Sequence, residues 1–137
     1  MSHPVRAARQ RIQDEHRPIV AAVSDCADQV AAPWDTSRTT DPDRVADSLR
    51  AALDSTGLLE RLPGVLADAV DATGYDLPAQ PVSAPPYVVV TSRGPVLRAT
   101  IDPGRLVVRF DVFEVVRDPG PAYRRLDGVE LAVSLMR

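Results

Sequence analysis

Residues 86–118, PYVVVTSRGPVLRATIDPGRLVVRFDVFEVVRD, decide the fold of this chain. Runs rich in valine are separated by short segments with glycine and proline, as in antiparallel strands joined by tight turns. The pattern predicts strands at Tyr87–Ser92, Val96–Ile101 and Arg105–Val116, and a later run predicts a fourth at Val129–Met136. We therefore expect a four-stranded antiparallel sheet in the second half of the chain.

The register of this sheet follows from which side chains must share a face. Turns with an even number of residues place Val90 opposite Leu97 and Leu97 opposite Phe110, whereas an odd turn would set an apolar residue against a charged one. One face of the sheet is then wholly apolar. Because an apolar face must be buried, we expect helices to cover it.

The third predicted strand, Arg105–Val116, departs from strict alternation. Val112 and Phe113 are adjacent apolar residues, so both faces of the strand become apolar there. The pattern predicts a β-bulge, or a strand end that is covered on both sides.

The opposite face of the predicted sheet carries the candidate binding residues. In the expected register Arg98 lies across from Arg109, and like charges directly opposed destabilise a sheet unless something negative lies between them. Either an anion or a partner's acidic side chain binds there, or Asp111, Glu114 or an acid of the helical half neutralises the pair, or both arginines extend into water. The turn at residues 91–95 resembles an anion-binding loop in composition, but it lacks repeated glycines and a following helix, so we expect a plain hairpin turn. The candidate ligand- or partner-binding residues are Tyr87, Arg93, Arg98, Arg109 and Phe113.

The first half of the chain predicts helices. Apolar residues recur at steps of three and four from Val5 to Val30, which predicts one helix over Pro4–Ala31. Pro18 removes one backbone hydrogen bond, so we expect a kink there rather than two unrelated helices. His16 lies on the apolar stripe just before the kink, and we expect it to bond a carbonyl that the proline frees.

Two further helices and a linker are expected before the sheet. Asp41 predicts the N-cap of a second helix, which ends at Gly57. A third helix is expected over Leu58–Thr73, with Pro63 and its neighbouring glycine splitting off the first turn and Gly74 ending it. Residues 75–86 are rich in proline and predict an extended linker.

Together these elements predict a single α+β domain over residues 1–137. A helical layer of three helices, the first of them kinked, occupies residues 1–74 and packs on the four-stranded antiparallel sheet of residues 87–137. The two halves differ in charge. Residues 1–86 carry eight arginines and thirteen acids (net −5), and residues 87–137 carry eight arginines and six acids (net +2).

Composition indicates a cytoplasmic protein. Apolar residues make up 45% of the chain, but no run reaches the roughly 20 residues that a membrane-spanning helix needs. The first residues lack the apolar stretch of a secretory signal. Cys26 is the one cysteine and cannot form an internal disulfide. We expect a core thiol in a reducing compartment and no membrane association.

The types of charged residue in the chain indicate the kind of organism from which it comes. All sixteen basic residues are arginine, and fifteen of the nineteen acidic residues are aspartate. These preferences accompany GC-rich codons and adaptation to salt. The chain, and residues 86–118 above all, resembles a small uncharacterised haloarchaeal protein family. The resemblance implies no activity, substrate or site.

No pattern in the chain predicts catalysis, a metal or a cofactor. The seven glycines are too far apart for a phosphate-binding loop, and the two histidines lie within the first predicted helix (His16) or directly before it (His3), without a nucleophile beside them. His3, His16 and Cys26 do not have metal-ligand spacing. A net charge of −3 argues against nucleic-acid binding.

We therefore expect a non-enzymatic protein-interaction or adaptor module, whose partner is another protein or a second copy of the chain. The alternative is a small-molecule or anion-binding regulatory domain that uses arginines on the outer face of the sheet.

Overall fold

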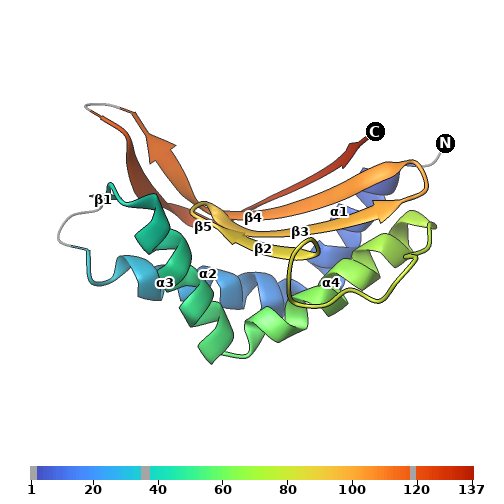
Figure 1. Cartoon of the computed structure of the whole chain (residues 1–137), viewed down its shortest axis with the longest axis horizontal. Helices are drawn as coiled ribbons and strands as arrows, with labels where there is room; N and C mark the ends of the chain where they lie inside the picture. The colour runs from blue at the N-terminus through green and yellow to red at the C-terminus, as the bar shows by residue number, and fades with distance from the viewer. Residues whose placement is uncertain (1–2, 35–37, 118–119) are drawn as a thin grey trace.

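The computed structural model describes residues 3–34, 38–117 and 120–137 (Figure 1). This part of the chain forms four helices, α1 (Pro4–Glu15), α2 (Arg17–Ala31), α3 (Pro42–Ser55) and α4 (Leu58–Thr73). It also forms five strands, β1 (Arg38–Thr39), β2 (Val88–Thr91), β3 (Gly94–Ile101), β4 (Gly104–Val116) and β5 (Ala122–Met136). The strands make one antiparallel sheet in the order β1-β5-β4-β3-β2, and the helices lie together against one of its faces. The predicted α+β class is confirmed, but the predicted counts of three helices and four strands are wrong.

The predicted first helix is two helices, α1 and α2, separated by His16. At His16 the backbone leaves the helical region, with φ −120° and ψ 25°. Pro18 has no N–H to continue the ladder, and the chain begins a new one when the amides of Ile19 and Val20 donate to the carbonyl oxygen of His16 at 3.0 and 3.1 Å. Ile12 and Ile19 are nevertheless both buried, so the apolar stripe stays in phase across the break.

Helix α3 begins and ends where the sequence predicts. Oδ1 of Asp41 accepts a hydrogen bond from the Arg44 amide at 3.1 Å, which makes Asp41 the N-cap. After Thr56, Gly57 takes the left-handed conformation (φ 78°), which glycine adopts without steric cost, and the chain turns directly into α4. Gly74 follows the last residue of α4, as expected.

Helix α4 runs unbroken through Pro63, so the predicted split of its first turn is wrong. A proline inside a helix costs about 3 kcal/mol. Leu62 and Leu66, one on each side of the proline, are fully buried in the core. Burying each leucine contributes roughly 1.5–3 kcal/mol, which offsets the lost hydrogen bond and keeps both turns on one helix.

Strands β2, β3 and β4 confirm the predicted strands, but their register differs from the prediction by two residues. Val88 lies opposite Leu97, and Leu97 lies opposite Val108. Both connections are two-residue turns, and Gly94 and Gly104 already belong to strands. Since the shift is even, every side chain keeps its predicted face.

The shifted register removes a predicted contact. Arg98 lies opposite Val107, and Arg109 lies opposite Val96. The expected pair of directly opposed arginines, Arg98 and Arg109, therefore does not exist. Each turn lies one residue nearer the N-terminus than the predicted register requires, which moves the pairing by two residues, and alternation of side chains does not distinguish between these two positions.

Strand β5 begins seven residues before its predicted start, and β1 was not expected. Residues 122–128 are mostly polar and lack the valine pattern, yet the first four of them pair with the last residues of β4, from Phe113 to Val116. Strand β1 contains two residues, which pair with Tyr123 and Arg124 of β5. Both features depend on a neighbouring strand rather than on a local sequence signal.

The predicted β-bulge in the third predicted strand is confirmed. Asp111 pairs with Glu130, but Phe113 pairs with Arg125, so the register shifts between them. Arg125 fills this gap in the ladder with its guanidinium, which donates to the carbonyl oxygens of Val112, Leu126, Gly128 and Ser24, to Oγ of Ser24 and to Oδ1 of Asp28. The bulge is thereby held against α2.

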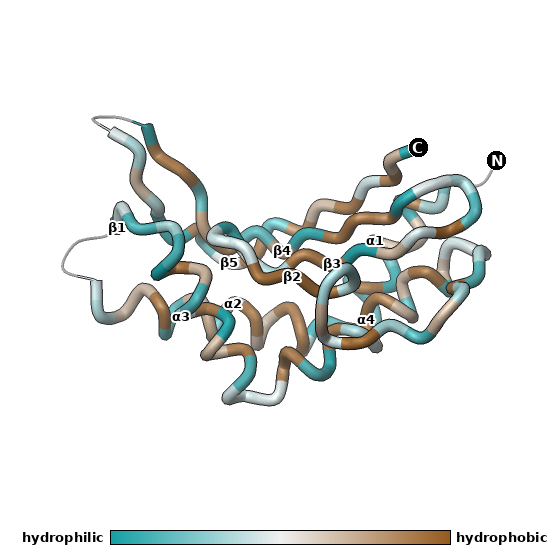
Figure 2. The backbone as a smooth tube through the Cα atoms, viewed as in Figure 1, coloured by the Kyte–Doolittle hydropathy of each residue, from teal (hydrophilic) through white to brown (hydrophobic). Residues whose placement is uncertain are grey.

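The core lies between the helices and one face of the sheet, where the brown segments of Figure 2 face each other. Its largest fully buried side chains include Ile12, Leu49, Leu53, Leu62, Leu66, Leu97, Leu106 and Phe110. Residues 75–86 form neither helix nor strand, as expected of the linker. Within the described ranges no helix is long and apolar enough to cross a membrane.

Candidate functional site

The face of the sheet opposite the helices is open (Figure 1). We call it the open face. The strand register assigns to it alternate residues of four strands: Val89 and Thr91; Val96, Arg98 and Thr100; Arg105, Val107, Arg109 and Asp111; Glu130, Ala132, Ser134 and Met136. Val107 and Asp111 are each only 9% exposed, although no helix covers them. Neighbouring side chains of the face, with long arginine stems among them, therefore shield its centre.

The five predicted binding residues do not form one site. Arg98 and Arg109 are both on the open face, as expected, but Arg109 pairs with Asp111 at 3.4 Å. Arg93 lies in the turn between β2 and β3, where its carbonyl oxygen accepts hydrogen bonds from the amides of Val112 and Phe113. Phe113 is fully buried and packs on Trp34, with ring centroids 5.5 Å apart, so it belongs to the core.

Tyr87 and Arg98 are brought together at the edge of the open face. The Arg98 amide donates to the Tyr87 carbonyl oxygen at 2.8 Å. Both residues line a pocket of about 220 Å³ between residues 77–86 and the β3–β4 hairpin, and Arg105 lines it as well. Sequence reasoning missed Arg105, because the expected register placed it four residues away from Arg109, the expected partner of Arg98, whereas the observed register makes it a diagonal neighbour of Arg98. We call this pocket the Arg98 pocket.

Arg98 has an unusual side chain. Its Nε is buried, and it has no hydrogen-bond partner in the structure. A buried donor without an acceptor costs about 1–3 kcal/mol, and such groups often mark a place where an ion or ligand binds. Among the described residues, neither Arg98 nor Arg105 forms an ion pair.

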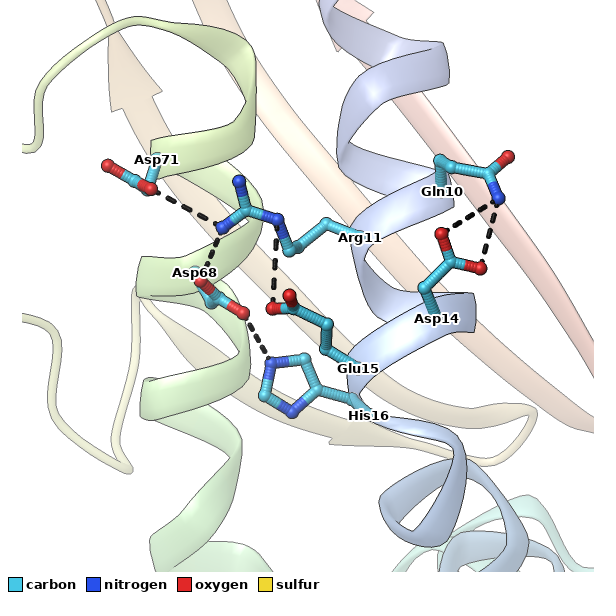
Figure 3. Close-up of polar contacts among 7 residues, drawn as sticks. All are labelled: Gln10, Arg11, Asp14, Glu15, His16, Asp68 and Asp71. Carbon is cyan, nitrogen blue, oxygen red and sulfur yellow. Dashed lines mark hydrogen bonds and ion pairs between the residues drawn. The ribbon is translucent and has the colours of Figure 1, made fainter.

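A second polar cluster joins α1 to α4 on the helical side of the molecule (Figure 3). Nε2 of His16 lies 2.7 Å from Oδ2 of Asp68, and Arg11 donates to Oδ1 of the same carboxylate at 2.7 Å. Arg11 also reaches Asp71 at 3.3 Å and Glu15 at 3.8 Å. The expectation that the His16 side chain bonds a freed carbonyl is therefore wrong, and its partner comes from a helix 52 residues away in the chain.

The cluster places one arginine, Arg11, beside the three carboxylates of Asp68, Asp71 and Glu15. Burial by itself would raise the pKa of Asp68, but hydrogen bonds from His16 and Arg11 outweigh it and hold that pKa below its ordinary value. The same contacts with Asp68 and Asp71 raise the pKa of the Arg11 guanidinium. Asp68 therefore stays ionised more readily than an ordinary aspartate, and its carboxylate accepts hydrogen bonds from Arg11 and His16.

The polar cluster borders an open cleft of about 500 Å³, but among the described residues no nucleophile lines it. Its lining comprises His16, Ile19, Arg61, Gly64, Val65, Ala67, Asp68 and Asp71. A His–Asp pair acts as a general base only beside a group that it can deprotonate. Cys26 cannot serve, since it is buried elsewhere in the core and burial raises the pKa of its thiol. We assign the cluster a structural role, in which it holds the α1–α2 break against α4.

Metal binding finds no support in the described ranges 3–34, 38–117 and 120–137. They contain no group of three or more His, Cys, Asp or Glu side chains that could hold an ion. In the polar cluster of Figure 3, Asp68 and Asp71 pair with Arg11 instead.

Fold and site together define a small α+β domain with one helix-covered sheet face, one open sheet face and an arginine-lined pocket at the edge of the open face. The chain belongs to the family described as domain of unknown function DUF7988, whose model matches residues 6–136. No curated protein and no solved structure matches the chain.

Proposed function

We propose that this chain is a non-enzymatic protein-interaction or adaptor domain that binds a protein partner through the open face of its sheet. The observation that supports this proposal is the layer arrangement, in which the helices cover one face and leave the other open (Figure 1). Val89 and Val96 are neighbours on the open face, and Ala132 follows in the same row beyond Arg109, so the middle of the face carries partly exposed apolar side chains around one arginine. Such mixed apolar and polar surfaces are typical of protein contacts.

The partner's contacting surface is acidic around an apolar centre. The open face carries Arg98, Arg105 and Arg109. Of its two acids, Asp111 is buried and already paired with Arg109, which leaves Glu130 as the exposed one. Residues 87–137 have a net charge of +2, from eight arginines and six acids. Complementary charge steers association and selects the partner.

The test compares two charge-introducing variants of the tagged full chain. Val96→Asp places a carboxylate at the middle of the open face, and Ala21→Asp places one on the exposed surface of α2. We expect the wild type and Ala21→Asp to retain one protein in near-equal molar amount from a lysate of the source cells. We expect Val96→Asp to retain at least about tenfold less, which corresponds to about 1.4 kcal/mol.

Two results would contradict the proposal. If Val96→Asp, checked for folding by its thermal midpoint, retains the same protein as well as Ala21→Asp does, the partner uses another surface. If light scattering shows that the wild type is a dimer and that Val96→Asp is a monomer, the open face binds a second copy and not an acidic partner.

The second candidate function is that of a small-molecule or anion-binding regulatory domain. One observation favours it, namely the buried and unpartnered Nε of Arg98 beside the Arg98 pocket. Arg93 and Arg109 do not line this pocket, so the arginine set differs from the one expected from the sequence. A thermal-shift series with carboxylates and phosphate tests this function, and no shift with any anion at millimolar concentration would contradict it.

A further inference from the structure

We propose that Arg98 and Arg105 bind the carboxylate of a small organic acid in the Arg98 pocket. This inference rests on the second function proposed above, and it specifies both the ligand and the residues that hold it. Three features of the pocket carry it: a wall of two unpaired arginines, a wall of apolar side chains, and a limited volume.

The first wall is cationic. Thr100 lies opposite Arg105, and Arg98 lies opposite Val107, so the two arginines are diagonal neighbours on the same face. Diagonal neighbours in an antiparallel pair are about 7–8 Å apart, within reach of a common ligand for long side chains. No acidic residue lines the pocket, and in the described part of the chain neither arginine has an ion pair. A pocket lined by charges of one sign attracts a counter-ion, so these two arginines favour an anion between them.

The second wall is apolar. Leu77, Pro78 and Pro86 come from the proline-rich segment, and the ring-bearing residue Tyr87 follows them. A hydrated inorganic ion would lose water against this wall without receiving a hydrogen bond in return. An acid with an aliphatic or aromatic body, in contrast, buries that body on the apolar wall while its carboxylate meets the arginines.

The volume sets the size of the ligand. At about 220 Å³ the pocket is smaller than the roughly 300–1,000 Å³ of pockets for drug-sized molecules. It exceeds the roughly 15 Å³ that one water requires by more than tenfold. A single ring or a short chain with one carboxylate fits this range.

The side chain of Arg98 favours a carboxylate as the anionic group that the pocket binds. Its guanidinium is a planar donor fork that matches the two oxygens of a carboxylate. Nε, one arm of this fork, is enclosed by protein and has no acceptor, so the guanidinium must turn toward the pocket to use it. Binding then supplies the hydrogen bond that Nε lacks.

The experiment titrates the full chain with three probes by calorimetry. Benzoate has the carboxylate and an apolar body, benzyl alcohol has the body without the charge, and inorganic phosphate has the charge without the body. We expect benzoate to bind at least about tenfold more tightly than either of the other two, a difference of about 1.4 kcal/mol.

Matched variants then locate the site. We expect Arg98→Met and Arg105→Met each to weaken benzoate binding about tenfold or more, because each removes a charged donor but keeps an apolar stem. Arg93→Met removes an exposed arginine of the neighbouring turn that does not line the pocket, and it should leave the affinity unchanged within about twofold. Arg98→Lys keeps the positive charge but lacks the planar pair of donors of the guanidinium, so it should bind benzoate more weakly than the wild type.

The outcomes separate this inference from the function on which it rests. If the wild type binds neither benzoate nor phosphate, the anion-binding function fails together with the pocket assignment. If benzoate binds and Arg98→Met and Arg105→Met bind it like Arg93→Met, the function stands and the assignment is overturned. If Arg98→Met does not fold, Arg105→Met and Arg98→Lys test the pocket assignment in its place. Wild-type affinity for benzoate in both variants would overturn that assignment.

Discussion

Nε2 of His16, at the break between α1 and α2, lies 2.7 Å from Oδ2 of Asp68 in α4. Arg11, which is one helical turn before the break, donates to the other oxygen of the same carboxylate. One aspartate therefore holds both α1 and the residue at the break that Pro18 imposes on the chain. The contact explains how two short helices can present one continuous apolar stripe to the core.

Asp68→Asn should lower the free energy of unfolding by about 1–3 kcal/mol near neutral pH, since hydrogen bonds to a charged group contribute on that order. The effect should depend on pH. The pKa of Asp68 is depressed in the folded protein, so the stability that it contributes is present above the ordinary pKa of 3.8 and is lost as the pH falls through the lower folded pKa. Denaturant unfolding at several pH values measures the difference between wild type and variant. A difference that stays constant down to the most acidic pH would contradict the assignment.

Arg125→Met should lower the free energy of unfolding by about 3 kcal/mol or more. The substitution leaves the carbonyl oxygens of Val112 and Gly128 without their donor and releases the bulge from Ser24 of α2. Arg124→Met is the matched control, because Arg124 pairs with Glu114 at the surface, where an ion pair contributes less than about 1 kcal/mol. Equal losses in the two variants, measured by urea unfolding, would show that the bulge contacts add nothing to stability.

Two glycine-to-alanine substitutions should act in opposite directions. At Gly94 a Cβ atom would meet the carbonyl oxygen of Phe110 in the paired strand, and the strand cannot yield without breaking the ladder, so we expect a loss of at least about 2 kcal/mol. Gly64 is inside α4, where a Cβ meets no atom within 4 Å, and alanine should add about 0.5–1 kcal/mol. Thermal unfolding of both variants checks the signs. A stabilised Gly94→Ala variant would contradict the two-residue turn at the end of β2.

Asp41→Ala should lower the free energy of unfolding by about 1 kcal/mol. The change removes the acceptor for the Arg44 amide and the negative charge at the start of α3. Asp41→Asn provides the control, because asparagine caps a helix about as well without the charge. Chemical denaturation of the three proteins should therefore rank the wild type and Asp41→Asn together above Asp41→Ala.

Part of the candidate site follows from the sequence. The alternation of residues 87–111 places Arg98 and Arg109 on the face away from the helices, and the structure agrees. The companion of Arg98 was not predictable, because Arg105 becomes a diagonal neighbour of Arg98 only in the observed register, which differs from the expected one by two residues. The alternation of side chains predicts that Phe113 is an exposed apolar residue. Beyond the bulge, however, its side chain lies in the core and packs on Trp34.

The sequence by itself determined the class of the fold, the covered face of the sheet, the bulge near Val112 and the cap at Asp41. Each of these depends on local propensity or on side-chain period, which a single chain displays directly. The tertiary structure alone decided the register, the pairing of β1 with β5, the unbroken helix through Pro63 and the contact between His16 and Asp68. These depend on contacts between residues far apart in the chain, where burial and hydrogen bonding in the assembled core outweigh local preference.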